Sequence, residues 1–135
     1  MIQIKKRIAI KKLAPVLMVN DVAATIKFYE EVLDFKRTVT VPDKAPFVFG
    51  MVNNGSIEIQ FQEAKSFVEN VAATKGCEIG GTVALYMDTA DVMTVYKRVV
   101  KQSKIVKKLH KTFYGTREFY MLDCNGYIIG FAEKQ

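Results

Sequence analysis

The chain has 135 residues, half of them hydrophobic and a quarter charged, with a net charge of +6; this balance is typical of one soluble globular domain. No apolar run approaches the roughly 20 residues of a membrane span, and the basic N-terminus lacks the apolar stretch of a secretory signal. Cys77 and Cys124 form no CxxC spacing, which favours a reduced, cytoplasmic protein over a disulfide scaffold.

The positive charge is concentrated in two runs. Residues 1–12 form a basic N-terminal extension with five Lys/Arg and no acid, and residues 97–111 hold seven more, again without an acid. In the extension, Ile2, Ile4, Ile8 and Ile10 alternate with polar residues, so it is either an edge strand added to an assembly or a frayed tail. Without a helix-turn-helix, zinc-finger or ribonucleoprotein motif, the runs favour a solvated face over nucleic-acid binding.

The first half of the chain predicts a strand, a helix and three strands. The helix spans 22–33, because Val22, Ile26, Tyr29 and Leu33 form one apolar stripe, and Asn20 or Asp21 is its cap. The expected strands are 16–20, 35–41, 47–52 and 56–62, with an Asn-Asn-Gly hairpin turn at 53–55 before the last of them.

The same order recurs after a linker of residues 64–80, which contains a short helix ending at Gly76. At a constant offset, Val16 aligns with Val83, Asp21 with Asp88 and Tyr29 with Tyr96. The second half therefore predicts a helix over 90–102, capped by Asp88 or Thr89, and strands over 82–87, 105–109, 117–122 and 127–132.

This repeat indicates two βαβββ modules. We expect an α+β fold in which the paired modules form a concave, incompletely closed mixed sheet with the helices on the outside. The extension covers residues 1–12, and one domain covers 13–134. Within that domain, module one spans about 13–63 and module two about 81–134.

Strand alternation separates the residues of the expected sheet into two sets. One set is uniformly large and apolar, as expected beneath the helices. The other mixes apolar and polar side chains: Met18, Glu58, Gln60, Thr82, Tyr86, Ile128 and Gly130. Apolar walls with a few polar groups are typical of a ligand cavity.

Three stretches carry a resemblance to a known family: "APVLMVNDVAATIKFYEEVLDFK" at 14–36, "NGSIEIQFQE" at 54–63 and "YGTREFYMLDCNGYIIGF" at 114–131. With the repeat, they resemble the glyoxalase/bleomycin-resistance/dioxygenase, or vicinal oxygen chelate, superfamily. The resemblance implies paired βαβββ modules, a homodimer and a cavity in the concave sheet. In the enzymes of the family, this cavity holds a divalent metal on His (or Gln) and Glu.

The ligand positions implied by the resemblance fall on Ala14, Glu58, Thr82 (or Gly81) and Gly130, so only Glu58 is a family-type ligand. The single histidine, His110, does not fall at such a position, and a metal site needs several converging donors. We therefore expect no metal and no other cofactor. The glycine at 130 is expected to leave room for a ligand near the backbone.

The predicted ligand-binding residues are Met18, Glu58, Gln60, Tyr86, His110, Tyr114, Arg117, Ile128 and Gly130; no catalytic residue is assigned. Glu58 is either a base or anchor, or a carboxylate that reaches solvent at the open mouth of the sheet or pairs with Arg117 or a lysine. Tyr86 either contacts a ligand or is structural, and His110 is either an acid or base or simply exposed. Arg117 is either functional or structural, paired with Glu118 or with a neighbouring strand.

Three functions remain. The favoured one is a metal-free homodimer that binds or sequesters a small aromatic or amphipathic molecule in the concave cavity. The second is a lyase, isomerase or dioxygenase of the superfamily with an atypical metal site. The third, of another class, is a nucleic-acid or partner-binding module that uses the basic runs. No contact with a membrane is expected.

Overall fold

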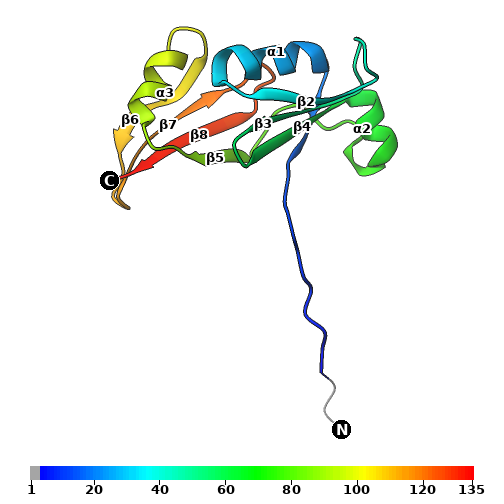
Figure 1. The fold of residues 1–135 in the computed structure, drawn as a ribbon, viewed down its shortest axis with the longest axis horizontal. Coiled ribbons are helices and arrows are strands. Elements are labelled where there is room, and N and C mark those ends of the chain that lie inside the picture. The colour runs from blue at the N-terminus through cyan, green and yellow to red at the C-terminus, as the bar shows by residue number, and fades with distance from the viewer. Residues whose placement is uncertain (1–3) are drawn as a thin grey trace.

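The structure is a computed structural model that describes residues 4–135 (Figure 1). The first module runs through β1 (Val16–Val19), α1 (Val22–Leu33), β2 (Lys36–Val41), β3 (Phe49–Asn54) and β4 (Ile57–Glu63). The linker holds α2 (Ala64–Asn70) and the short 3₁₀ helix η1 (Ala72–Thr74). The second module holds β5 (Ala84–Asp88), α3 (Val92–Val99), β6 (Lys104–Lys111), β7 (Thr116–Leu122) and β8 (Ile128–Lys134).

Each module contributes a four-stranded mixed sheet. The strand orders are β1-β4-β3-β2 and β5-β8-β7-β6, so β1 and β5 occupy equivalent sheet edges. β1 pairs with β4 and β5 with β8 in parallel, whereas the other neighbours are antiparallel. Helices α1 and α3 lie over the same side of the strands (Figure 1), and within residues 4–135 the strands do not close into a barrel. The predicted α+β fold of two paired βαβββ modules is confirmed.

The predicted helices differ from the observed ones mainly at their ends. α1 has the expected bounds and is capped by Asp21, whose Oδ1 accepts from the Ala24 N–H at 2.9 Å. The prediction that Asp88 or Thr89 caps the second helix is wrong: Asp91 does so, accepting from the Thr94 N–H. Asp88 is instead the last residue of β5, and the Thr89 N–H continues that strand's pairing by bonding the Ala132 carbonyl. The linker helix ends at Asn70, before the predicted Gly76.

The hydrophobic core lies between the helices and the two sheets. The predicted stripe of α1 is fully buried, since Val22, Ile26, Tyr29 and Leu33 are all below a tenth exposed. On the strands, Ile59, Phe61, Phe119 and Ile129 face the same core. Apolar area removed from water on this side supplies the main favourable contribution to folding.

The two modules are held together by polar contacts as well as by the core. The buried Tyr29 hydroxyl of α1 donates to Asp123 Oδ2 at 2.7 Å, and Asp123 belongs to the turn before β8. In the same turn, Asn125 Nδ2 donates to Thr25 Oγ1 at 3.0 Å. The Tyr127 hydroxyl donates to the Met18 carbonyl of β1 at 2.6 Å. One turn of module two is thus bonded to both the helix and the first strand of module one.

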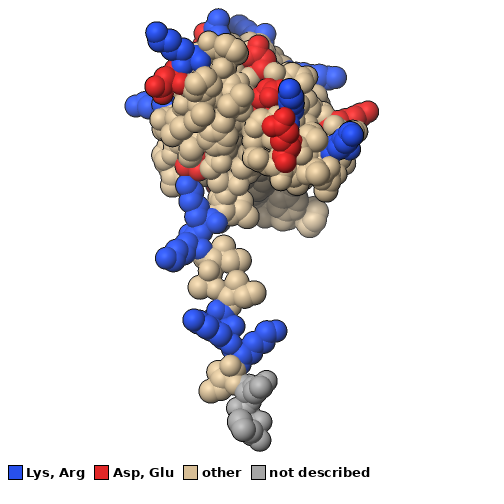
Figure 2. Space-filling view, turned by 90° about the vertical axis from the view of Figure 1, so that its right-hand side faces the viewer, with Lys and Arg blue, Asp and Glu red and all other residues tan. Residues whose placement is uncertain are grey.

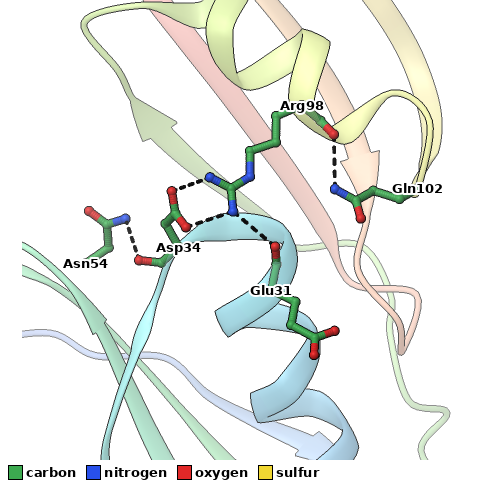
Figure 3. A network of polar contacts seen from close by, with 5 residues as sticks. All are labelled: Glu31, Asp34, Asn54, Arg98 and Gln102. Atoms are coloured by element: carbon green, nitrogen blue, oxygen red, sulfur yellow. Dashed lines mark hydrogen bonds and ion pairs between the residues drawn. The ribbon is translucent and has the colours of Figure 1, made fainter.

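A second link lies at the exposed ends of α1 and α3 (Figure 3). Asp34 adopts a left-handed conformation (φ 58°) that ends α1, and Arg98 of α3 reaches both of its carboxylate oxygens. The same guanidinium donates to the Glu31 carbonyl at 3.1 Å. Because both side chains are substantially exposed, this ion pair contributes at most about 1 kcal/mol and chiefly orients the helices.

Gly130 lies at a close approach of two tyrosine rings. In β8 it is paired with Tyr86 of β5 on one side and with Tyr120 of β7 on the other. A Cβ at 130 would lie 2.6 Å from Tyr120 Cε1 and 3.2 Å from Tyr86 Cδ1. The absent side chain therefore accommodates the protein's own rings, which occupy the space that the sequence had suggested for a ligand.

The Tyr29 hydroxyl gives a direct test of module pairing. Tyr29→Phe should lower the free energy of unfolding by about 1.5–3 kcal/mol, because it leaves a buried carboxylate oxygen without its donor. Tyr96→Phe is the matched control, since the Tyr96 hydroxyl makes no hydrogen bond within residues 4–135. Urea unfolding followed by circular dichroism measures both. Equal small effects would contradict the role given to the Tyr29–Asp123 bond.

The packing over Gly130 predicts that Gly130→Ala costs about 1–3 kcal/mol of stability, because the new methyl group overlaps the Tyr120 ring. In a Tyr120→Ala background, the same change should cost far less. A double-mutant cycle by urea unfolding measures this coupling. Additive effects of the two substitutions would show that the ring is not the obstacle.

Candidate functional site

The edges of β1 and β5 border an open groove where the two sheets meet. It consists of two adjoining cavities of about 480 and 420 Å³, both lined by Pro15, Val83 and Leu85. The first cavity extends towards the linker and includes Met18 and Tyr127, among others. The second extends towards the concave face and includes Glu58, Ala84 and Tyr86, among others. We call the two together the seam groove.

Tyr86 forms the module-two wall of the seam groove and is bonded to a buried carboxylate behind it. Glu118 of β7 is 1% exposed and lies on the concave side of its sheet. Its Oε2 accepts from the Tyr86 hydroxyl at 2.5 Å and from Thr116 Oγ1 at 3.0 Å, and its Oε1 accepts from the Tyr114 hydroxyl. We call Glu118 and these three hydroxyl residues the Glu118 cluster.

Hydrogen bonding within the Glu118 cluster shifts the pKa values of its members in opposite directions. Burial raises the pKa of Glu118, but the three hydroxyl donors and nearby His110 outweigh it, so the net pKa lies below the usual value. The bond to Glu118, assisted by burial, raises the pKa of Tyr86 to about 12. The hydrogen bond from the Tyr114 hydroxyl to Glu118 likewise raises the pKa of Tyr114. At neutral pH the cluster therefore holds a carboxylate and two protonated phenols.

Glu58 of β4 lies on the module-one wall and has different partners. Its Oε1 forms an ion pair with Lys12 at 2.9 Å, and its Oε2 accepts from Gln60 Nε2 at 2.8 Å. These two hydrogen bonds lower the pKa of Glu58 despite some burial. Of the alternatives left by the sequence, pairing with a lysine is the one observed, and the lysine belongs to the N-terminal extension.

The structure brings most of the predicted site residues to the concave side, but in separate groups. Met18 lines the linker end of the groove. Ile128 of β8 pairs with Ala84, which lines the other end. His110 of β6 lies opposite Glu118 in the register, and its Nδ1 is 2.7 Å from the Lys108 carbonyl. Arg117 is placed elsewhere: as its neighbour Glu118 faces the concave side, Arg117 faces the helix side, so the two do not pair.

Glu118, Thr116 and Tyr120 belong to the candidate site, and the sequence reasoning missed them. Alternation along Thr116–Leu122 puts Thr116, Glu118, Tyr120 and Leu122 on the face of Gly130. The signal in the sequence was a carboxylate, Glu118, in the middle of a strand and directly before Phe119 and Tyr120. The preceding Arg117 suggested an ion pair as a simpler role for this carboxylate.

The residues at the family's ligand positions do not fit a divalent metal. Glu58 is the only carboxylate among them, Lys12 and Gln60 already engage it, and tyrosine rings fill the space over Gly130. Within residues 4–135, no three His, Cys, Asp or Glu side chains are placed to hold a metal ion together.

A smaller cavity of about 230 Å³ lies on the helix side, between α1 and α3. Its main charged groups, Asp34 and Arg98, are paired with each other (Figure 3). Asn54, Asp88 and Thr94 also line this cavity, but its volume is only about half that of either part of the seam groove, so we take the seam groove as the candidate site.

The surface charge is uneven. Figure 2 shows lysine and arginine side chains along the N-terminal segment that projects from the domain, whereas acidic and basic side chains are mixed on the visible face of the domain. In the part of the chain that the structure describes, no helix is long and apolar enough to cross a membrane.

Several solved structures share the fold along almost the whole chain. A protein of unknown function from Agrobacterium tumefaciens has 22% identity and a TM-score of 0.76, over 96% of this chain and 98% of that one. A glyoxalase/bleomycin resistance protein/dioxygenase family enzyme from Burkholderia phytofirmans has 17% identity and a TM-score of 0.76, over 90% and 97%. A member of that superfamily from Sphaerobacter thermophilus has 20% identity and a TM-score of 0.73, over 93% and 98%.

None of the curated proteins compared with the chain matches it. The model of one family does match, over residues 10–131, and this span includes both βαβββ modules and the seam groove. The resemblance that the sequence motifs carried is therefore confirmed. The chain belongs to the glyoxalase/bleomycin resistance protein/dioxygenase superfamily.

Proposed function

We propose that this protein binds a small aromatic or amphipathic molecule in the seam groove, without a metal. The observation that carries the proposal is the groove itself, whose two cavities lie in the size range of small-molecule sites. Leu13, Ile57, Val83, Leu85 and other apolar side chains supply most of the lining, and Glu58 and Tyr86 are among its few polar groups. Such a lining suits a ligand that is mostly apolar and oriented by one or two polar contacts.

The carboxylates beside the groove favour binding over proton transfer. A general base that works near neutral pH needs a pKa raised towards that pH, as burial without donors would produce. The pKa values of Glu58 and Glu118 are both lowered, because each carboxylate accepts several hydrogen bonds. We therefore favour a protein that binds or sequesters its ligand over a lyase, isomerase or dioxygenase.

We further propose that the protein is a homodimer assembled through its N-terminal segment. Residues 4–11 extend away from the domain (Figure 1), and Ile4, Ile8 and Ile10 are 82–93% exposed. In an extended chain Ile4, Ile8 and Ile10 share one face, since their positions are all even. Exposed apolar residues in such an arrangement favour pairing with a second copy, as does the family resemblance.

Both cysteines are free, which agrees with a cytoplasmic protein.

Filling the groove tests the binding proposal. The neutral aromatic probe N-phenyl-naphthylamine should gain fluorescence with the wild-type protein, and Ala84→Trp should weaken its binding about tenfold or more by occupying the cavity. Val106→Trp, at an exposed position of β6, is the matched control and should bind as the wild type does. Equal binding by both variants would place the probe outside the groove and reject the proposal.

The dimer proposal predicts that Ile8→Asp with Ile10→Asp produces a monomer, because each aspartate would be buried in the interface. Light scattering after size-exclusion chromatography measures the mass. Lys5→Gln with Lys11→Gln removes charge from the same segment but keeps its apolar face, and should remain dimeric. A monomeric wild-type protein would overturn the proposal.

A further inference from the structure

We propose that the groove selects ligands that carry a cationic or N–H donor group next to their aromatic part, and that the Glu118 cluster provides this selectivity. The inference rests on the proposed binding function and specifies the chemistry of the ligand. It follows from the direction of the hydrogen bonds within the cluster and from the charge that they surround.

The phenol protons of the cluster point inwards. A tyrosine hydroxyl has one proton to donate, and the protons of Tyr86 and Tyr114 are both donated to Glu118. The phenol oxygens therefore offer only acceptor lone pairs to anything that approaches from the concave side. An N–H or ammonium group satisfies such an acceptor, whereas a carboxylate or phosphate oxygen would meet a second acceptor and be repelled.

The charge at the centre of the cluster is not paired with a lysine or an arginine within residues 4–135. The ion pairs of residues 4–135 involve Glu58, Glu30 and Asp34, and none involves Glu118. Its neighbours on the concave side are three hydroxyl groups and, across the strand pair, His110. Hydroxyl donors satisfy the hydrogen-bonding capacity of a carboxylate but leave its negative charge in place, and a ligand cation would offset this charge.

The aromatic rings reinforce the same preference. Tyr86 is 48% exposed and lines the groove, and the Tyr86 and Tyr120 rings lie 6.4 Å apart over Gly130. The face of an aromatic ring attracts a cation through its quadrupole. A glycine at 130 is what allows both rings to lie there, so the local sequence and the proposed selectivity are connected.

Glu58 serves as an internal comparison. It is also a carboxylate at the groove, but Lys12 already neutralises it. The selectivity should therefore depend on Glu118 far more than on Glu58, although Glu58 lies directly in the cavity lining and Glu118 lies behind Tyr86.

The test compares three probes of similar size: phenethylamine, which is cationic at neutral pH, phenethyl alcohol and phenylacetate. Binding to the wild-type protein is measured by NMR titration. The amine should bind about tenfold more tightly than the carboxylate, with the alcohol between them. In Glu118→Gln, the preference for the amine should disappear while the alcohol still binds. Glu30→Gln, which removes the same charge from a distant surface position, should keep the preference.

Each other outcome is decisive. If the alcohol binds but the amine and carboxylate bind equally, or if Glu118→Gln keeps the preference, the inference is wrong and the proposed binding function stands. If none of the three probes binds, both fail. If Glu118→Gln does not fold, the NMR signals of the Tyr86 ring in the wild-type protein test the inference instead. These signals are assigned by their loss in Tyr86→Phe. They must shift with the amine and not with an equal concentration of the carboxylate.

Discussion

The hydrogen bond from the Tyr29 hydroxyl to the Asp123 carboxylate determines how the two modules of this protein meet. A single βαβββ module leaves part of its apolar surface uncovered, and the second module covers it. The buried phenol holds the turn before β8 against α1, and the neighbouring Asn125 and Tyr127 extend the contact to Thr25 and β1. With β8 placed in this way, its parallel partner β5 is placed too.

The seam groove is a consequence of this pairing. β1 and β5 are each bonded to one strand of their own sheet and not to each other, so their free edges border an opening. The helix sides of the two sheets continue into a shared apolar core, whereas the concave sides meet at the groove. The same contacts that stabilise the domain thus leave a mostly apolar opening at its centre.

The Glu118 cluster lies next to the position where the resemblance implies a metal-binding carboxylate. At the position where the resemblance implies a metal-binding carboxylate, Gly130 admits the rings of Tyr86 and Tyr120. A carboxylate is present close by, but on β7 and behind the Tyr86 phenol, where hydroxyl groups rather than a metal satisfy its oxygens. The proposed recognition of a ligand by hydrogen-bond direction and charge rests on this arrangement.

The sequence by itself determined the two modules, the bounds of α1 and the alternation that puts Glu58 and Tyr86 on the concave side, because these depend on local periodicity and turn chemistry. It also singled out Gly130 as unusual. Only the tertiary structure decided that Lys12 is the partner of Glu58 and that Tyr86 of β5 donates to Glu118 of β7, because these contacts join residues far apart in the chain. It also decided that tyrosine rings fill the space over Gly130, since that contact joins β5 to the β7–β8 hairpin, which follows it only after α3 and β6.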